Sequence, residues 1–205
     1  MEHTKNTNAN EGIRSRTTVF YDECFPNAEV LAMILTHKNH TIVNSWGKDC
    51  YDVGYSTLIG NGHVLHASHL RSNYKSYASK TSWKYPEKEV FAARTEYLWE
   101  DLGALNLALG GTSNLTEYAR LKETHGSESY KVKSKLSKVG RATFCCHLHD
   151  ENEIYEQLIL SSVNLPMREK QKTLNVLYED CGIPLNQYQN SSFSWKEWAQ
   201  SRCGL

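Results

Sequence analysis

The sequence predicts an α+β fold in which a small antiparallel sheet packs against helices. The first observation is a pair of β-rich segments, Asp52–Gly60 and His63–Ser68, joined by a Gly-Asn-Gly turn. Asn-Gly between apolar flanks is a strong hairpin signal, so we expect two adjacent antiparallel strands. The second observation is a helical spacing of apolar residues from Phe144 to Val163, ended by Pro166.

Composition predicts a single globular domain that recognises its partners locally. The chain has 205 residues, of which 40% are hydrophobic and 22% charged, and its formal net charge is zero. This balance is typical of a globular protein and argues against a nucleic-acid partner, which requires a basic surface. We expect a flexible N-terminal tail at residues 1–16 and one domain at residues 17–205. We expect no cofactor.

Three absences give expectations about the compartment. The sequence has no apolar run long enough for a transmembrane helix, so we expect no stable membrane insertion. Its polar beginning lacks the apolar core of a signal peptide. The six cysteines are scattered without a dense spacing, which favours reduced thiols over a disulfide scaffold. We therefore expect cytoplasmic synthesis, with export, if any, by a route without a cleavable leader.

The N-terminal half reads as mostly β-structure. Thr17–Tyr21 is a short β-like run, and His40–Trp46 and Glu89–Arg94 are further expected strands. The segment after Pro26 fits either a helix or a buried strand. Glu96–Leu109 has helical periodicity and ends at a Gly-Gly pair, which indicates a helix terminus.

The C-terminal half reads as helical after a polar stretch. Residues 122–138 are rich in lysine and are expected to form a solvated loop or exposed strand. A last long helix at residues 168–180 ends before Gly182. The tail is expected to dock through Trp195 and Trp198.

A thiol, an imidazole and a carboxylate form the candidate catalytic site. We expect Cys145 at the start of a helix, where the helix dipole lowers the pKa of a thiol. The hairpin would place His66 beside Asp52, so that the carboxylate orients the imidazole that activates Cys145. Backbone amides at the start of the helix would stabilise the oxyanion.

The order of these segments resembles a known family. The segments AMILTHKN, NSWGK, YDVGYSTLIGNG, HVLHAS and FCCHL, within residues 30 to 160, are similar to the circularly permuted NlpC-type papain-like amidases, relatives of lecithin-retinol acyltransferase. The resemblance implies a papain-like fold and a Cys-His-Asp triad. Asp52 stands where the family usually carries its histidine and His66 where many relatives carry an acid, so the two roles are exchanged.

The resemblance implies a cysteine hydrolase that attacks an amide bond. The expected substrate is a peptide, most simply a cell-wall peptide of peptidoglycan, and the expected role is that of a secreted bacterial toxin effector with a possible immunity or delivery protein. Two alternatives stay open: a lipid acyl hydrolase or acyltransferase, and a non-catalytic binding module on the same fold, which the exchanged pair favours.

Other assignments of the site also stay open. Cys146 is a neighbouring candidate nucleophile, and Cys24 precedes a possible helix in an unpermuted order. A zinc site is conceivable because histidines and cysteines cluster in two places, although no spacing typical of zinc ligands supports it; these are Cys145, His147 and His149, and His63, His66 and His69. The segment Asn44–Gly47 resembles the asparagine segment of papain, but we expect Trp46 to be a core residue.

Overall fold

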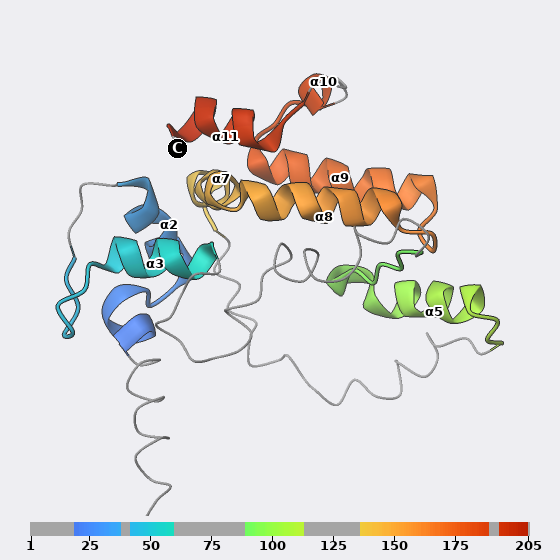
Figure 1. Ribbon diagram of the computed structural model, residues 1–205, viewed down its shortest axis with the longest axis horizontal. Helices are drawn as coiled ribbons and strands as arrows, with labels where there is room; N and C mark the ends of the chain where they lie inside the picture. Colours follow the sequence, from blue (N-terminus) through green and yellow to red (C-terminus); the bar gives the residue numbers. More distant parts are fainter. Residues whose placement is uncertain (1–18, 38–41, 60–88, 113–135, 189–192, 205) are drawn as a thin grey trace, which may run out of the picture.

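The computed structural model describes residues 19–37, 42–59, 89–112, 136–188 and 193–204, and their regular structure is helical (Figure 1). Within these ranges there is no strand, and β-pairing is limited to two isolated bridges, Val43 with Asp49 and Val90 with Ser162. The expected α+β fold, papain-like with a small antiparallel sheet, is therefore wrong. The expected strand His63–Ser68 and its hairpin turn lie outside the described residues.

Three short helices form the N-terminal part. They are η1 (Val19–Cys24), a π-helix, and the α-helices α2 (Ala28–Thr36) and α3 (Cys50–Leu58), drawn in blue and cyan in Figure 1. Their apolar side chains share one core, formed by Phe20, Cys24, Phe25, Ile34, Cys50 and Val53. The β-like run expected at Thr17–Tyr21 is thus helical from residue 19, and the segment after Pro26 is a helix.

The strand expected at Asp52–Gly60 is instead helix α3. Asp49 caps this helix, because its Oδ1 accepts a hydrogen bond of 2.7 Å from the Tyr51 backbone amide. The β-rich composition of the segment is overruled by burial, since Val53 faces the core and a disulfide joins Cys50 to Cys24. Strand propensity is a weak signal when one face of a helix can be buried.

The loop before α3 is a tight turn rather than the strand expected at His40–Trp46. The buried Asn44 side chain organises it, because its Oδ1 accepts hydrogen bonds from the amides of Trp46 and Lys48 at 3.0 and 3.1 Å. The Trp46 side chain is 40% exposed, so its expected place in the core is wrong.

The C-terminal part is a helical assembly around a second core. Helices α8 (His149–Ser161) and α9 (Met167–Cys181) lie side by side, α7 (Lys138–His147) precedes α8, and α11 (Trp195–Cys203) packs against α7 and α8 (Figure 1). The core includes Cys146, Ile159, Leu174, Tyr178 and Trp195. The helix expected from Phe144 thus begins earlier, and a break at Leu148 separates α7 from α8.

Two sequence signals in this part are confirmed. The long helix expected at residues 168–180 is α9, and Gly182 follows it with φ of 70°, the left-handed geometry of a helix C-cap. The short helix α10 (Leu185–Tyr188) comes next. Trp195 and Trp198 dock the tail, with side chains only 2% and 7% exposed.

Aromatic stacking fixes that tail. The Tyr178 ring lies between the rings of Tyr188 and Trp195, with centroids 3.9 and 5.5 Å away. The Glu156 carboxylate accepts hydrogen bonds from the Tyr178 hydroxyl and from Trp195 Nε1, the latter at 2.6 Å. Burial, followed by the contact with Glu156, raises the pKa of Tyr178 far above its ordinary value. The phenol therefore stays protonated and keeps donating to Glu156.

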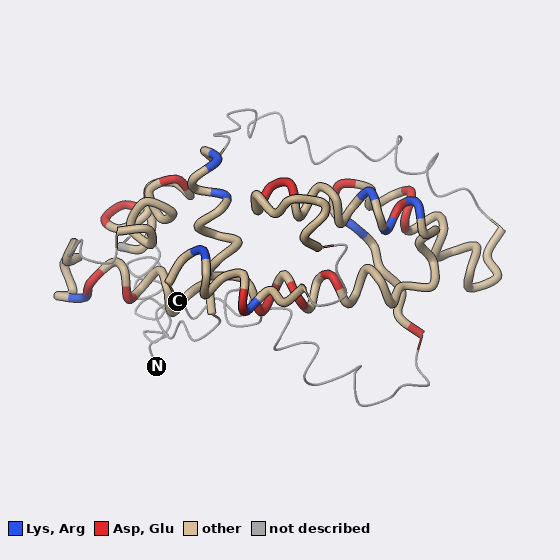
Figure 2. Tube along the Cα trace, turned by 90° about the horizontal axis from the view of Figure 1, so that it is seen from above, with Lys and Arg blue, Asp and Glu red and all other residues tan. Residues whose placement is uncertain are grey.

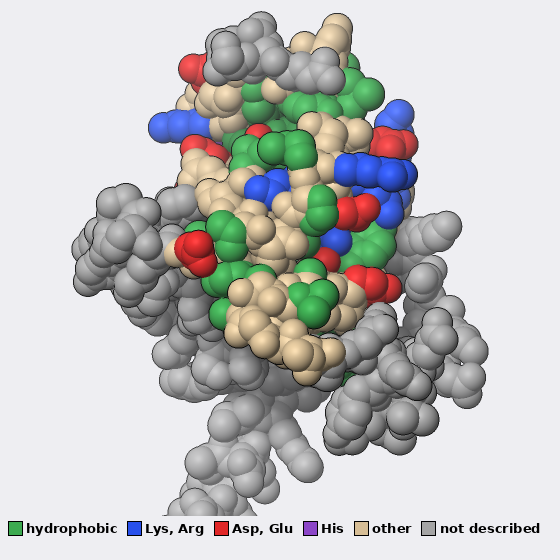
Figure 3. Space-filling view, turned by 90° about the vertical axis from the view of Figure 1, so that its right-hand side faces the viewer, with side chains coloured by type: hydrophobic (Ala, Val, Ile, Leu, Met, Phe, Trp, Pro, Cys, Tyr) green, Lys and Arg blue, Asp and Glu red, His purple; other side chains and the backbone are tan. Residues whose placement is uncertain are grey.

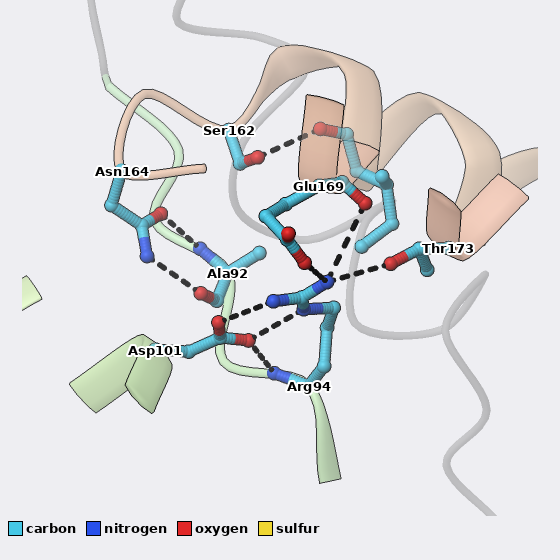
Figure 4. A network of polar contacts seen from close by, with 8 residues as sticks. Ala92, Arg94, Asp101, Ser162, Asn164, Glu169 and Thr173 are labelled. Carbon is cyan, nitrogen blue, oxygen red and sulfur yellow. Dashed lines mark hydrogen bonds and ion pairs between the residues drawn. The ribbon is translucent and has the colours of Figure 1, made fainter. Parts of the chain in front are cut away.

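Helix α5 (Leu98–Ala108), preceded by η3 (Thr95–Tyr97), confirms the helix expected at Glu96–Leu109. The buried guanidinium of Arg94 joins α5 to α9 (Figure 4). Arg94 Nε and Nη2 donate to the two Asp101 oxygens at 2.8 and 2.7 Å, and Nη1 donates to Thr173 Oγ1 at 2.8 Å. Nη1 also lies 3.3 Å from Glu169 Oε2.

Over the described residues, neither sign of charge dominates the surface. Basic and acidic positions alternate along the helices (Figure 2), and hydrophobic side chains lie among charged ones in the view from the side (Figure 3). In the ranges that the structure covers, every helix is too short or too polar to cross a membrane.

Candidate functional site

The expected nucleophile has no thiol in this structure. Cys145 lies in the last turn of α7, not at the start of a helix, and forms a disulfide with Cys181 at the end of α9. The favourable helix dipole that we expected to lower its pKa is absent at this end of a helix, where the partial charge is negative. A sulfur in a disulfide cannot act as a thiolate unless the bond is first reduced.

Of the other two members of the triad, only Asp52 belongs to the described residues. Asp52 lies in the first turn of α3 with an exposed side chain. His66 lies outside the described residues. The Cys145, His66 and Asp52 triad therefore remains a prediction that the geometry does not test.

The expectation of reduced cysteines is wrong. Three disulfides pair all six: Cys24 with Cys50, Cys145 with Cys181, and Cys146 with Cys203. The two alternative nucleophiles, Cys146 and Cys24, are therefore also bonded. The zinc alternative loses its thiolate ligand at Cys145, and no group of three metal-ligating side chains occurs among the described residues. His63 and His69 lie outside those residues.

A cavity of about 490 Å³ lies where the N-terminal helices meet the C-terminal ones. Its walls come from the end of α2, one face of α7, the end of α9 and the end of α11. Leu35, Val139 and Ala142 give it an apolar surface, and the Cys146–Cys203 disulfide forms part of the wall. Its volume lies within the usual range of sites for small molecules.

Charged side chains border this apolar space. Lys138 at the start of α7 and Arg202 near the end of α11 contribute to its lining, together with Asp180. Asp180 already pairs with a cation, because Arg141 Nε lies 3.2 Å from its Oδ1. The charge balance of the lining is therefore positive, which favours a ligand with an anionic group.

Hydrogen bonds join α2 to α7, the two helices that form one side of the cavity. Glu29 of α2 accepts hydrogen bonds from the Ser137 amide at 2.8 Å and from the Ser137 hydroxyl at 2.5 Å. These bonds lower the pKa of Glu29, because they stabilise its ionised form. Farther along, the hydroxyls of Thr36 and Thr143 lie 2.8 Å apart. The two helices are thus tied at both ends of their contact.

Sequence reasoning missed this site. Lys138 ended the stretch expected to be a solvated loop or exposed strand, and Ala142 lay in no expected element, although Ser137 is a good N-cap residue for a helix starting there. In the structure the Ser137 hydroxyl accepts a hydrogen bond of 2.9 Å from the Gly140 amide. The even number of cysteines was also a signal for disulfides, but their connectivity cannot be read from spacing.

No family model matches the chain, and no curated protein or solved structure gives a match either.

Proposed function

We propose that this chain is a disulfide-bonded helical binding protein rather than an enzyme. Its ligand is a small molecule with an apolar body and one acidic group, which it holds in the cavity among α2, α7 and α11. The observation that carries the proposal is the cavity itself, apolar in its lining and bordered by Lys138 and Arg202. Burial of an apolar body would supply most of the affinity, and the two cations would select an acidic group.

The state of the cysteines supports binding over cysteine hydrolysis. Cys145 and Cys146 each join α7 to another helix, a structural use that leaves no free thiol at either position. Disulfides persist in oxidising compartments, so the proposed binding takes place outside the reducing cytosol. The hydrolase, with peptidoglycan peptides as substrate, stays a separate prediction.

Ligand binding is tested with two probes that have the same aromatic rings and differ in charge. Anilinonaphthalene sulfonate carries an anionic group, whereas N-phenylnaphthylamine has the same rings without it. We expect saturable binding of the sulfonate to the oxidised protein and weaker binding of the amine. Ala142→Trp fills the cavity and abolishes the binding of both probes. The double variant Lys138→Gln, Arg202→Gln weakens the binding of the sulfonate alone, by about 3–10-fold, because it removes two exposed charge contacts.

The control is Arg168→Gln, which removes an exposed cation in the first turn of α9. It leaves binding unchanged. Circular dichroism verifies that each variant is folded, because the sulfonate also binds partly folded states. Unchanged binding by a folded Ala142→Trp variant would overturn the proposal.

The hydrolase is tested with matched cysteine variants. Cys145→Ala and Cys181→Ala break the same disulfide, but Cys181→Ala leaves a free thiol at Cys145. Cleavage of muropeptides by wild type in reductant and by Cys181→Ala, but not by Cys145→Ala, would replace the binding proposal by the hydrolase. We expect no cleavage by any of the three proteins.

A further inference from the structure

The segment Glu89–Arg94 has an extended backbone that bonds to the body of the protein at three alternate residues, Val90, Ala92 and Arg94. The Val163 amide donates to the Val90 carbonyl at 2.8 Å. The Asn164 side chain bonds both the amide and the carbonyl of Ala92, at 2.9 and 2.8 Å (Figure 4). Two residues farther on, the Arg94 amide donates to Asp101 Oδ2 at 2.7 Å. Every second residue thus bonds to the body of the protein, as in one side of a β-ladder.

Among the described residues, no backbone or side chain pairs with the outer side of the same segment. In an extended chain the amides and carbonyls of the intervening residues point the opposite way. For Phe91 and Ala93, no hydrogen bond to backbone or side chain occurs in the part of the chain that the structure describes. An unpaired edge of this kind is a template for another strand.

The edge is also held rigid. Arg94 is almost fully buried and binds Asp101, Glu169 and Thr173, while Asn164 is 9% exposed. A partner strand would therefore meet a backbone that is already extended, which lowers the entropic cost of binding.

The surroundings specify the side chains of a partner. A cavity of about 350 Å³ lies between this segment and α8, where Tyr155, Leu158 and Ile159 line it, and it has room for an apolar side chain. Glu89 and Glu96, both exposed, stand at the two ends of the segment. The nearby cation Arg94 is neutralised by Asp101, so the exposed charges that the described residues place at this edge are the two carboxylates.

We propose that the outer edge of Glu89–Arg94 binds an extended peptide of another protein, which adds to it as a strand. Backbone hydrogen bonds to Phe91 and Ala93 hold the peptide, an apolar side chain enters the cavity beside α8, and a basic residue faces Glu89 or Glu96. This is recognition by β-strand addition. The surface is separate from the cavity among α2, α7 and α11, so either proposal can fail alone.

The probe is a capped seven-residue peptide of alternating valine and lysine, titrated into the full oxidised chain labelled with nitrogen-15. We expect chemical shift changes centred on Phe91 and Ala93 and at least tenfold slower hydrogen exchange of these two amides. The same peptide with alternate backbone nitrogens methylated binds at least tenfold more weakly, because it has lost the donors of the ladder. A glutamate-valine peptide also binds more weakly.

Two variants locate the site. Ala93→Pro removes an outer amide that makes no internal bond, so the protein folds but the peptide no longer binds. Glu96→Gln weakens binding severalfold, whereas Glu100→Gln, an exposed carboxylate in the first turn of α5, does not.

Three outcomes overturn the proposal. The first is that the methylated peptide binds as tightly as the unmethylated one. The second is that a folded Ala93→Pro variant binds the peptide as tightly as wild type does. The third is that, without peptide, the protection of the Phe91 and Ala93 amides from hydrogen exchange rises with protein concentration. The last would assign the edge to a second copy of this chain.

Discussion

Arg94 is the residue on which the position of α5 depends most. Its guanidinium and the Asp101 carboxylate are 4% and 3% exposed, so both charges have lost their water. The hydrogen bonds to Asp101 raise the pKa of Arg94 above its already high value, and the cation persists at every ordinary pH. The Tyr97 ring covers it as well, with the Arg94 Cζ atom 4.4 Å from the ring centroid.

Asp101→Asn should therefore destabilise the protein severely. The substitution leaves the buried cation with only the partly exposed Glu169 carboxylate, 3.3 Å away, and losing one partner of a buried ion pair costs about 3–5 kcal/mol. Urea unfolding of wild type and variant measures the difference. Asp180→Asn is the control, because its ion pair with Arg141 is exposed and contributes no more than about 1 kcal/mol. Equal losses for the two variants would contradict the assigned role of the buried pair.

At the scale of the elements, close helix contacts decide which glycines are replaceable. Gly54 in α3 faces the N-terminal core, and a Cβ atom there would lie 2.6 Å from Leu31 Cδ1 and 2.9 Å from Phe25 Cζ. Gly103 in α5 has no atom within 4 Å of the equivalent position. The same substitution therefore has opposite consequences in the two helices.

Gly54→Ala should lower the free energy of unfolding by about 1–3 kcal/mol, because the overpacked core must shift. Gly103→Ala should raise it by about 0.5–1 kcal/mol, because alanine is the better helix former and meets no obstacle. Thermal and urea denaturation of the two variants measure the signs. A stabilised Gly54→Ala variant would show that α3 does not pack against α2 as described.

Helices with clear ends were predictable from the sequence, whereas short β-rich segments were not. The helix at 168–180 combined a regular apolar period with a glycine stop, and both signals act locally. Residues 52–58 carry valine, tyrosine and threonine, yet form α3, since their conformation depends on packing with α2 and on the disulfide to Cys24. The segment Glu89–Arg94, expected as a strand, is extended but has one isolated bridge.

The candidate site could not be predicted for the same reason. Leu35, Ala142 and Arg202 are far apart in the sequence and carry no motif, so only the packed helices bring them to one cavity. Conversely, the cysteine, histidine and aspartate of the expected triad carried a strong chemical pattern. That pattern did not reveal that Cys145 bonds to Cys181.

At the scale of the whole molecule, three disulfides join the helices and add to the stability that the two hydrophobic cores provide. The Cys145–Cys181 and Cys146–Cys203 disulfides tie α7 to α9 and α11, and the Cys24–Cys50 disulfide closes the N-terminal part. Because α2 packs chiefly on α7, the three bonds stabilise the two parts around a common contact.

Replacing both Cys146 and Cys203 by serine should destabilise the oxidised protein by about 4 kcal/mol. This bond spans 57 residues, and the entropy of the unfolded chain that it removes grows with the length of the closed loop. Urea unfolding without reductant measures the loss, and wild type in reductant should lose more because all three bonds open. A loss below about 1 kcal/mol would contradict a stabilising role for this bond.

The adjacent cysteines of α7 also constrain the route by which the chain matures. Neighbouring residues on an α-helix point about 100° apart, so a formed helix presents one sulfur to α9 and the other to α11. In an unfolded chain the two thiols are equivalent neighbours, and exchange of partners is easy. Folding of α7 before oxidation would therefore favour the two native pairs, because the helix directs each sulfur toward a different partner.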